Sequence, residues 1–150
     1  LAQKFTILTV ARSGEARGAR WSEIDLEAAE WRIPEERMKA KREDRVPLTE
    51  PVLETLRLAR ELAQRPDDVI FPSFRAGRPL SDMTLSAVLK RLDVDAPVHG
   101  FRSAFPHEVK EAALAHQVKN RVEAAYRRTD LFEKRRDLMN EWGSFVSERS

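Results

Sequence analysis

Residues 31–51 have the sequence WRIPEERMKAKREDRVPLTEP, and this stretch predicts a β-hairpin followed by a helix. Residues 31–33 and 45–48 are short runs of alternating character, as is typical of strands, and a polar, basic segment from residue 37 to 44 separates them. Thr49 can cap a helix, and Pro51 stands in its first turn, where proline is favoured. We therefore expect a hairpin with a charged tip that leads directly into a helix.

Helices are predicted on both sides of this hairpin. Residues 1–11 are mostly apolar and unbroken, a pattern that fits a buried helix or strand and that we interpret as a helix. Ser13 is expected to cap a second helix, with Glu15 in its first turn. The helix after Thr49 should continue until Pro66. Its expected buried side chains are Val52, Leu53, Leu56 and Leu62.

The second half of the chain predicts more helix than strand. Residues 69–71 are expected to form a brief strand and residues 75–79 a turn, while short helical stretches are expected at 107–117 and 122–127. Ser81 and Thr129 each cap a predicted helix. The apolar sides of these two helices are Met83, Leu85, Val88, Leu89 and Leu92 in the first, and Leu131, Leu138, Trp142 and Phe145 in the second. The sequence thus predicts one α+β domain, mainly helical with a small antiparallel sheet.

The composition excludes several classes of protein and site. A chain of 150 residues fits one domain, and with 41% hydrophobic residues it is too apolar for a disordered chain. Its 27 Lys and Arg against 25 Asp and Glu give a net charge of +2, so any basic surface must come from placement. The lack of cysteine excludes disulfides, a cysteine nucleophile and thiolate metal sites. No apolar run approaches the ~18 residues of a membrane-spanning helix.

Signatures of metal and nucleotide binding are also missing from the sequence. The five glycines are scattered, without either glycine-rich phosphate-binding pattern. His99, His107 and His116 lack the close pairing and the carboxylate partner of a metal site. No nucleophile elbow occurs, although the sequence leaves a Ser-His-Asp triad open. We therefore expect a protein that works without a cofactor.

The remaining candidates are basic and imidazole side chains around one phenol. Tyr126 is the only tyrosine, and a lone tyrosine on a helix surface is most commonly structural. Arg12 beside a helix start is by itself an ordinary exposed charge, and Lys39 at a hairpin tip an ordinary solvated lysine. His99 and Arg102, three residues apart, share one side of a helical turn, but such pairs are common by chance.

Taken in order along the chain, these residues resemble those of a known family. The pattern is Arg12-x-x-Glu15, Lys39 in a hairpin, His99-x-x-Arg102, Leu114-x-His116 and Tyr126. It resembles the catalytic domain of tyrosine recombinases, the phage integrase family, over nearly the whole chain. Residues 11–21, 79–83 and 122–136 look especially like integrases of prophages and genomic islands.

The resemblance implies a fold, a reaction and a role for each residue. The fold would be the α+β catalytic fold of tyrosine recombinases, and the reaction DNA breaking and rejoining through a 3′-phosphotyrosyl intermediate. Tyr126 matches the nucleophile, and Lys39 the hairpin lysine that acts as general acid, with Lys41 as a less favoured alternative. The other matches are Arg12 and Arg102 as phosphate-clamping arginines, His99 as base or proton shuttle, His116 as a hydrogen-bond donor to the phosphate and Glu15 as the support of Arg12.

The same resemblance implies partners and a location. Double-stranded DNA would be the substrate of a homo-oligomer, a tetramer in this family, with accessory DNA-bending proteins as further candidates and the bacterial cytosol as its place. A type IB topoisomerase shares this chemistry but matches the local sequence less well. Two alternatives from other classes stay open: a non-catalytic DNA-binding or regulatory module that keeps the fold, and an unrelated helical protein-interaction domain.

Residues 1–150 are expected to be the C-terminal catalytic domain, truncated on its N-terminal side. The chain opens without Met and without a signal peptide, and we expect it to begin mid-helix. Between Arg102 and His116 it is shorter than the family spacing by roughly ten residues, nearly three turns of helix. Pro106 closely follows the helix-like start at Arg102, and proline inside a helix costs ~3 kcal/mol or more. We therefore expect residues of the natural polypeptide to be missing between Phe105 and Pro106.

Overall fold

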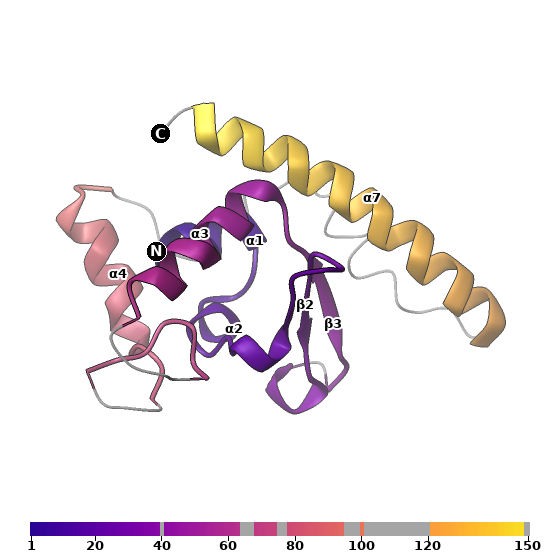
Figure 1. Ribbon diagram of the computed structural model, residues 1–150, viewed down its shortest axis with the longest axis horizontal. Helices are drawn as coiled ribbons and strands as arrows, with labels where there is room; N and C mark the ends of the chain where they lie inside the picture. Colours follow the sequence, from indigo (N-terminus) through magenta and orange to yellow (C-terminus); the bar gives the residue numbers. More distant parts are fainter. Residues whose placement is uncertain (40, 64–67, 75–77, 95–99, 101–120, 149–150) are drawn as a thin grey trace.

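The structure is a computed structural model that describes residues 1–39, 41–63, 68–74, 78–94, 100 and 121–148, of which 121–130 are described by their backbone alone. The shorter helices lie to the left of a small sheet, and one long helix runs along the top and right of the molecule (Figure 1). The predicted α+β class with a small antiparallel sheet is confirmed.

The chain begins with two short helices. α1 (Ala2–Thr9) confirms the helix predicted at this end, and it buries Phe5 completely. It ends at Val10, whose φ of 54° is left-handed and unusual for a β-branched residue. After this change of direction follow α2 (Ser13–Arg17) and the short 3₁₀ turn η1 (Trp21–Glu23).

A three-stranded antiparallel sheet forms the middle of the domain. β1 (Ile24–Asp25), β2 (Glu30–Ile33) and β3 (Asp44–Pro47) lie in that order, and Trp31 of β2 pairs with Val46 of β3. β2 and β3 are the predicted hairpin. No sequence pattern predicts β1, because two residues are too few to show an alternation.

The connection between β2 and β3 is a folded loop. It contains the 3₁₀ turn η2 (Glu35–Arg37), after which Met38 returns to the core. Lys41 has a left-handed φ of 51°, and its N–H donates to the C=O of Met38 at 3.0 Å. Lys39 lies within this closed turn and is exposed, as expected for the charged end of the hairpin.

α3 (Glu50–Glu61) begins after its predicted cap residue, Thr49, and buries Val52 and Leu56. The prediction that Leu62 is buried is wrong, since its side chain is 69% exposed. At 3.6 residues per turn, a position six residues after Leu56 is rotated by about 240° around the helix axis. Leu62 therefore points away from the buried stripe.

α4 (Asp82–Arg91) also begins at its predicted position, and its core contacts come from Leu85 and Leu89. Met83 and Leu92, which were expected on the same apolar side, are exposed. Met83 lies about 200° around the axis from Leu85, and Leu92 follows the end of the helix. The buried face of α4 is thus narrower than the sequence predicts.

Residues 69–71 do not form the predicted strand. Val69 makes an isolated antiparallel bridge with Arg20, and the N–H of Ile70 donates to the C=O of Ala19 at 2.9 Å. This segment therefore pairs with the chain after α2 over a short distance and contributes its side chains to the core. The turn predicted at 75–79 lies mostly, and the helix predicted at 107–117 entirely, outside the described residues.

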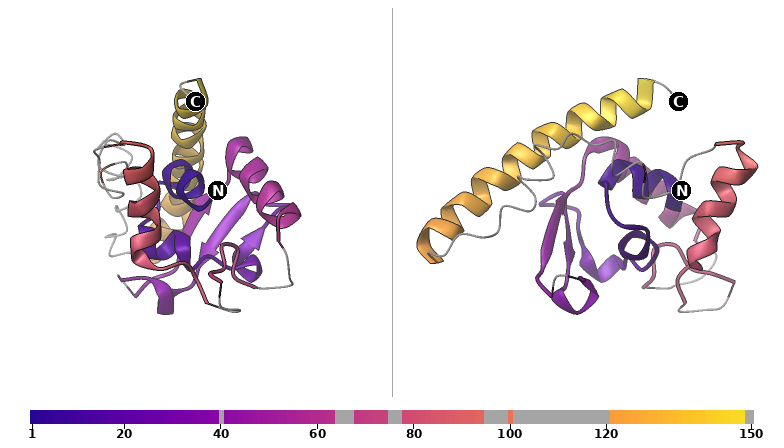
Figure 2. Two further views of the ribbon diagram at one scale, coloured as in Figure 1. Left: turned by 90° about the vertical axis from the view of Figure 1, so that its left-hand side faces the viewer. Right: turned by 180° about the vertical axis from the view of Figure 1, so that it is seen from behind.

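α7 (Arg121–Glu148) is one continuous helix, so the helix start predicted at Thr129 is wrong. Neither proline nor glycine interrupts residues 121–142, and a helix that has formed extends at little cost. α7 lies beside β3 and over α1 and α3 (Figure 2). Its described buried apolar side chains are Phe132 and Met139, with the predicted Leu138 and Trp142 half-buried and the predicted Phe145 exposed.

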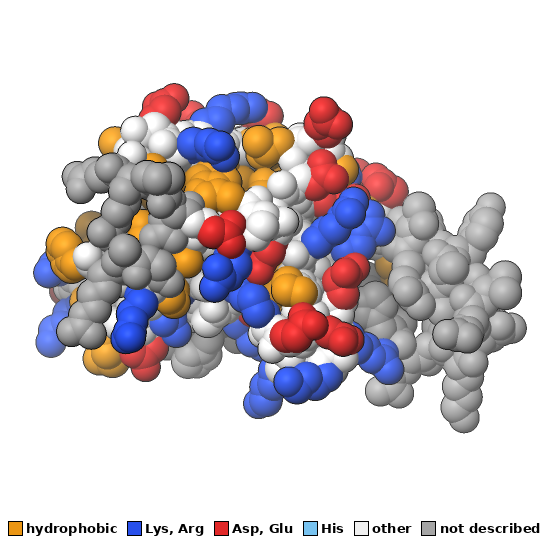
Figure 3. Space-filling view, turned by 60° about the horizontal axis from the view of Figure 1, so that its bottom comes forward, with side chains coloured by type: hydrophobic (Ala, Val, Ile, Leu, Met, Phe, Trp, Pro, Cys, Tyr) orange, Lys and Arg blue, Asp and Glu red, His pale blue; other side chains and the backbone are white. Residues whose placement is uncertain are grey.

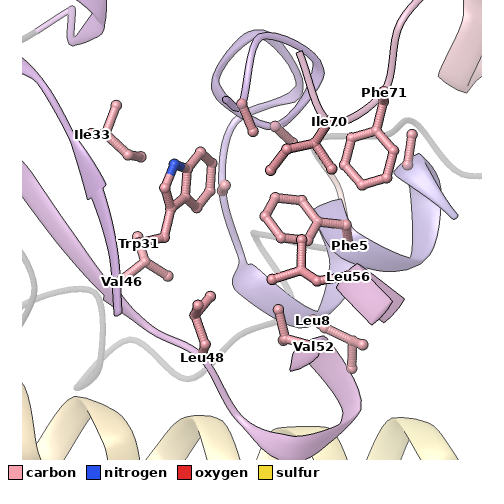
Figure 4. Close-up of a cluster of buried hydrophobic side chains, with 14 of the residues drawn as sticks. Phe5, Leu8, Trp31, Ile33, Val46, Leu48, Val52, Leu56, Ile70 and Phe71 are labelled. Carbon is pink, nitrogen blue, oxygen red and sulfur yellow. The ribbon is translucent and has the colours of Figure 1, made fainter. Parts of the chain in front are cut away.

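Three aromatic rings join the elements of the core (Figure 4). The ring of Phe5 from α1 lies with its centroid 5.1 Å from that of Trp31 in β2 and 5.3 Å from that of Phe71. Both pairs are tilted, an arrangement that aromatic rings favour at this separation. Val52 and Leu56 of α3 belong to the same cluster, so the sheet, α1, α3 and the segment around Phe71 share one core.

The turn between β1 and β2 allows a test of backbone strain. Ala29 has a left-handed φ of 50°, and its C=O accepts the N–H of Leu48 at 2.8 Å. Ala29→Gly should raise the free energy of unfolding by about 0.5–1 kcal/mol, because glycine adopts positive φ without the Cβ penalty. Thermal melting measures this. Ala28→Gly is the matched control without positive φ and should lower Tm; a lower Tm for both variants would contradict strain at Ala29.

Candidate functional site

Arg12 stands at the start of α2, directly after the change of direction at Val10. Its backbone N–H donates to Oε2 of Glu15 at 2.8 Å, and its guanidinium Nη1 donates to Oε1 of the same carboxylate at 2.8 Å. The cap residue of α2 is therefore Arg12 and not the predicted Ser13. The cap lies one residue earlier because Glu15, in the first turn, accepts the N–H that precedes the helix.

In the Arg12–Glu15 pair, a buried carboxylate holds a guanidinium that is about half exposed. The Glu15 side chain is 7% exposed, whereas that of Arg12 is 46% exposed. A guanidinium carries five donors in a flat fork, and Glu15 engages its Nη1. The structure thus presents an oriented, charged donor group at the surface, where it can bind an anionic oxygen.

Lys39 and Lys41 both lie in the β2–β3 loop, and both are exposed. Lys39 directly follows Met38, whose side chain is buried in the core. Lys41 lies at the left-handed position that closes the turn. Lys39 is therefore adjacent in sequence to a core residue, whereas Lys41 is tied to that residue by its backbone N–H.

A further arginine, Arg37, joins the Lys39 loop to the Arg12 helix. Its Nη2 donates to the backbone C=O of Glu15 at 2.6 Å, and its Nη1 is paired with the carboxylate of Glu23. The Glu23 carboxylate also accepts the indole N–H of Trp31 at 2.9 Å. No sequence pattern marks Arg37 or Glu23, because the partners of Arg37 are 14 and 22 residues away along the chain.

A third ion pair with a buried carboxylate ties β2 to β3 at the base of the hairpin. Glu30 accepts a hydrogen bond from Nε of Arg45 at 2.9 Å, and a longer one from Nε of Arg32 at 3.3 Å. The hydrogen bond from Arg45 lowers the pKa of Glu30 below its usual value, although burial by itself would raise it. The guanidinium of Arg45 also lies 4.4 Å from the ring centroid of Phe132, so the hairpin contacts α7 at this point.

Tyr126 lies on α7, and the C-terminal part of this helix is anchored to the rest of the domain. Nη1 of Arg135 donates to Oδ1 of Asp44 at 3.0 Å, and the indole N–H of Trp142 donates to the C=O of Ile7 at 2.9 Å. These contacts attach the C-terminal part of α7 to β3 and α1. The side chain of Tyr126, and the whole of His99, Arg102 and His116, lie outside the described residues.

The described part of the site is thus Arg12, Glu15 and the loop of Lys39. Within the described ranges no three His, Asp or Glu side chains are grouped as for a metal ion, and no helix is long and apolar enough to cross a membrane. On the side of the molecule where the β2–β3 loop lies, acidic and basic side chains are mixed (Figure 3).

One protein-family model matches most of the chain. The family model described as "Phage integrase family" matches residues 1–127. The chain belongs to the phage integrase family. The match includes Arg12, Lys39 and Tyr126, and it ends one residue after Tyr126. The family predicted from the sequence is confirmed.

Relatives of this family member include integrases of prophages and phages. Prophage integrase IntA of Escherichia coli (strain K12) is 41% identical over 154 positions, which cover 95% of this chain and 37% of the relative. The integrase of Enterobacteria phage P4 is 30% identical over 97% of this chain and 39% of its own length. The chain spans about two fifths of the length of these relatives.

The alignment with IntA is longer than the part of this chain that it contains. It has 154 positions, whereas 95% of the 150 residues is about 143 residues. About 11 positions of the relative therefore have no counterpart in this chain.

A solved structure shares the fold of this phage integrase family member. It is the Tn1549 transposon integrase in complex with circular intermediate DNA, which matches 84% of this chain and 48% of that chain with a TM-score of 0.51. At 14% sequence identity the likeness establishes the fold, and it agrees with the recombinase fold expected from the sequence.

The Glu30–Arg45 pair predicts how stability depends on pH. Because the pKa of Glu30 is lowered by folding, its contribution is present above its ordinary pKa of 4.5 and is lost as the pH falls through the lower, folded-state value. Glu30→Gln should lower the free energy of unfolding by about 1–3 kcal/mol at pH 7 and make it less dependent on pH below 4.5. Denaturant unfolding between pH 3 and pH 7 measures both effects.

The exposed Glu27 provides the matched control for this prediction. Glu27→Gln removes the same charge in the turn between β1 and β2. This variant should leave the free energy of unfolding at pH 7 within ~0.5 kcal/mol of the parent. An equal loss in both variants, or an unchanged acid dependence in Glu30→Gln, would contradict the role of the pair.

Proposed function

We propose that this chain is the part of a site-specific DNA recombinase that breaks and rejoins DNA, with Tyr126 as the nucleophile. The observation that carries the proposal is the Arg12–Glu15 pair, a half-exposed guanidinium held by a buried carboxylate in a chain of the phage integrase family. A donor whose orientation is already fixed stabilises charge as it develops on a phosphate, without having to reorganise during the reaction.

The phenol of Tyr126 needs help to attack a phosphodiester. With a pKa of about 10, a phenol is about one-thousandth ionised at pH 7, a deficit of about 4 kcal/mol. Its oxygen would bond to phosphorus while the 5′ oxygen of the DNA leaves, so one ester bond replaces another and rejoining needs no nucleotide. Arg12 and Arg102 would bind the non-bridging oxygens, where each well-placed donor contributes ~3–4 kcal/mol.

Lys39 is proposed as the group that protonates the leaving 5′ oxygen. General acid catalysis of this kind typically contributes ~10²–10⁴-fold in rate. The position of Lys39 next to the buried Met38 supports this assignment over Lys41. From their places in the family pattern, His99 would act as base or proton shuttle, and His116 would donate a hydrogen bond to the phosphate.

Double-stranded DNA is the proposed substrate. The Tn1549 transposon integrase, which has the same fold, is described as a complex with circular intermediate DNA. The net charge of +2 and the mixed surface support weak, salt-sensitive binding by this segment alone, so further contacts would come from a homo-oligomer on DNA and from accessory DNA-bending proteins. The bacterial cytosol is the proposed location, by the same family relationship.

A second candidate function is a DNA-binding or regulatory module that keeps the fold without turnover. The observation that favours it is the absence of a counterpart for about 11 positions of IntA. If the residues that we expect between Phe105 and Pro106 are absent from the natural polypeptide, His116 and Tyr126 would be displaced relative to Arg102, and ~1 Å of misplacement can cost ~10²-fold in rate. We propose that the natural polypeptide contains them and that residues 1–150 are its C-terminal catalytic domain.

The nucleophile is tested by Tyr126→Phe in the full-length protein. This variant should bind DNA but form no covalent complex with a nicked suicide substrate, because the phenyl ring has no oxygen to bond to phosphorus. Denaturing electrophoresis of labelled DNA measures the adduct. Tyrosine occurs nowhere else in the 150 residues, so no neighbour within the chain can replace it.

The same assay separates the candidate functions. An adduct formed by Tyr126→Phe would show that the nucleophile is elsewhere. DNA binding without an adduct by the parent protein would favour the non-catalytic module, and a lack of DNA binding would favour a protein-interaction domain.

The general acid is tested by Lys39→Ala on two substrates. On ordinary DNA the variant should lose ~10²–10⁴-fold in cleavage rate. A substrate with sulfur at the bridging 5′ position has a leaving group that needs no proton, so it should recover most of this loss. Lys41→Ala is the matched control and should cleave ordinary DNA at close to the parent rate. Equal defects of Lys39→Ala on the oxygen and sulfur substrates would contradict the assignment.

A further inference from the structure

Arg37 belongs to the β2–β3 loop that carries Lys39, and its side chain reaches from this loop to the backbone of α2. It ends the short η2 turn, two residues before Lys39, and its side chain is 20% exposed. One of its terminal nitrogens is paired with Glu23, whose side chain is 7% exposed, and the other donates to the backbone C=O of Glu15 at 2.6 Å. A single guanidinium therefore links the start of the Lys39 loop to the α2 backbone.

Gly18 keeps open the space that this guanidinium occupies. A Cβ atom at position 18 would lie 2.9 Å from Nη2 of Arg37, closer than real Cβ contacts. The same Nη2 is the atom that donates to Glu15, so a side chain at position 18 would displace the donor from its acceptor. The α2 backbone and the Arg37 side chain are thus fitted to each other.

We infer that Arg37 is a positioning residue that holds the Lys39 loop at a fixed place relative to the Arg12 guanidinium. This inference rests on the proposed function. Glu15 is the shared reference: its carboxylate orients Arg12, and its carbonyl receives Arg37. The cation that would bind the phosphate and the ammonium that would protonate the leaving oxygen are therefore set by one residue.

A positioning role and a purely structural role of Arg37 predict different defects when its guanidinium is removed. Met38 anchors the loop in the core independently of Arg37, so the loop should stay folded when the guanidinium is removed. What changes is the position of Lys39, and a displacement of ~1 Å can cost ~10²-fold in rate. A defect of this origin affects the protonation of the leaving group, whereas a general loss of structure affects every step.

The test compares Arg37→Ala and Arg37→Lys in the full-length protein with oxygen and sulfur suicide substrates. Arg37→Ala should cleave the oxygen substrate ~10²-fold more slowly and recover most of that rate on the sulfur substrate. Arg37→Lys should lose less rate than Arg37→Ala, because the ammonium keeps the positive charge beside Glu23. It should still lose some rate, because an ammonium cannot bind Glu23 and the Glu15 carbonyl at once as a flat guanidinium does. If Arg37→Ala does not fold, as judged by its thermal melting, Arg37→Lys and Gly18→Ala give the same comparison.

Arg32→Ala is the matched control, because Arg32 lies on the same hairpin and pairs with Asp25 and Glu30 rather than with α2. It should show no difference between the two substrates. Equal losses of the Arg37 variants on both substrates, or no loss on either, would overturn the inference while the parent protein still forms its adduct. A parent protein that forms no adduct on either substrate would overturn the proposed function, and the inference with it.

Discussion

Trp31 packs its fully buried ring against Phe5 and donates its indole N–H to Glu23, so one side chain belongs both to the apolar core and to the polar network. The packing fixes β2 relative to α1. The N–H needs an acceptor, since a buried donor without one costs ~1–3 kcal/mol. Glu23, held at that place, pairs in turn with Arg37. The one polar atom of this core side chain is therefore connected, through Glu23, to the arginine of the β2–β3 loop.

The charged groups of the described site follow one arrangement. Three carboxylates with little exposure, those of Glu15, Glu23 and Glu30, each hold an arginine that reaches further into solvent. A buried carboxylate is costly unless it is paired and hydrogen-bonded, and the arginines supply both conditions. The negative charge thus stays inside, while each guanidinium group is more exposed than the carboxylate that holds it. Near-zero net charge and specific cationic sites are compatible for this reason.

The hairpin and several helix starts were predictable from neighbouring residues, whereas one helix boundary and the exposure of some apolar side chains were not. The hairpin and the helix after Thr49 follow from alternation and from a local cap, both of which operate within a few residues. The continuous α7 was not predicted because threonine is a favoured cap residue, so Thr129 suggested a helix start. In the structure the helix continues on both sides of Thr129. Leu62 and Met83 look like core residues by type, but the direction of each side chain on its helix decides its exposure.

The sequence by itself determined the family, because residues such as Arg12, Lys39 and Tyr126 occur in the order that is typical of the phage integrase family. It also determined which acid supports Arg12, since Glu15 is three residues away in the same helical turn. Only the tertiary structure decided how the parts of the site are joined. Arg37 meets Glu23 and Glu15 only in the folded chain, and a contact made across 14 or 22 residues leaves no periodic trace in the sequence.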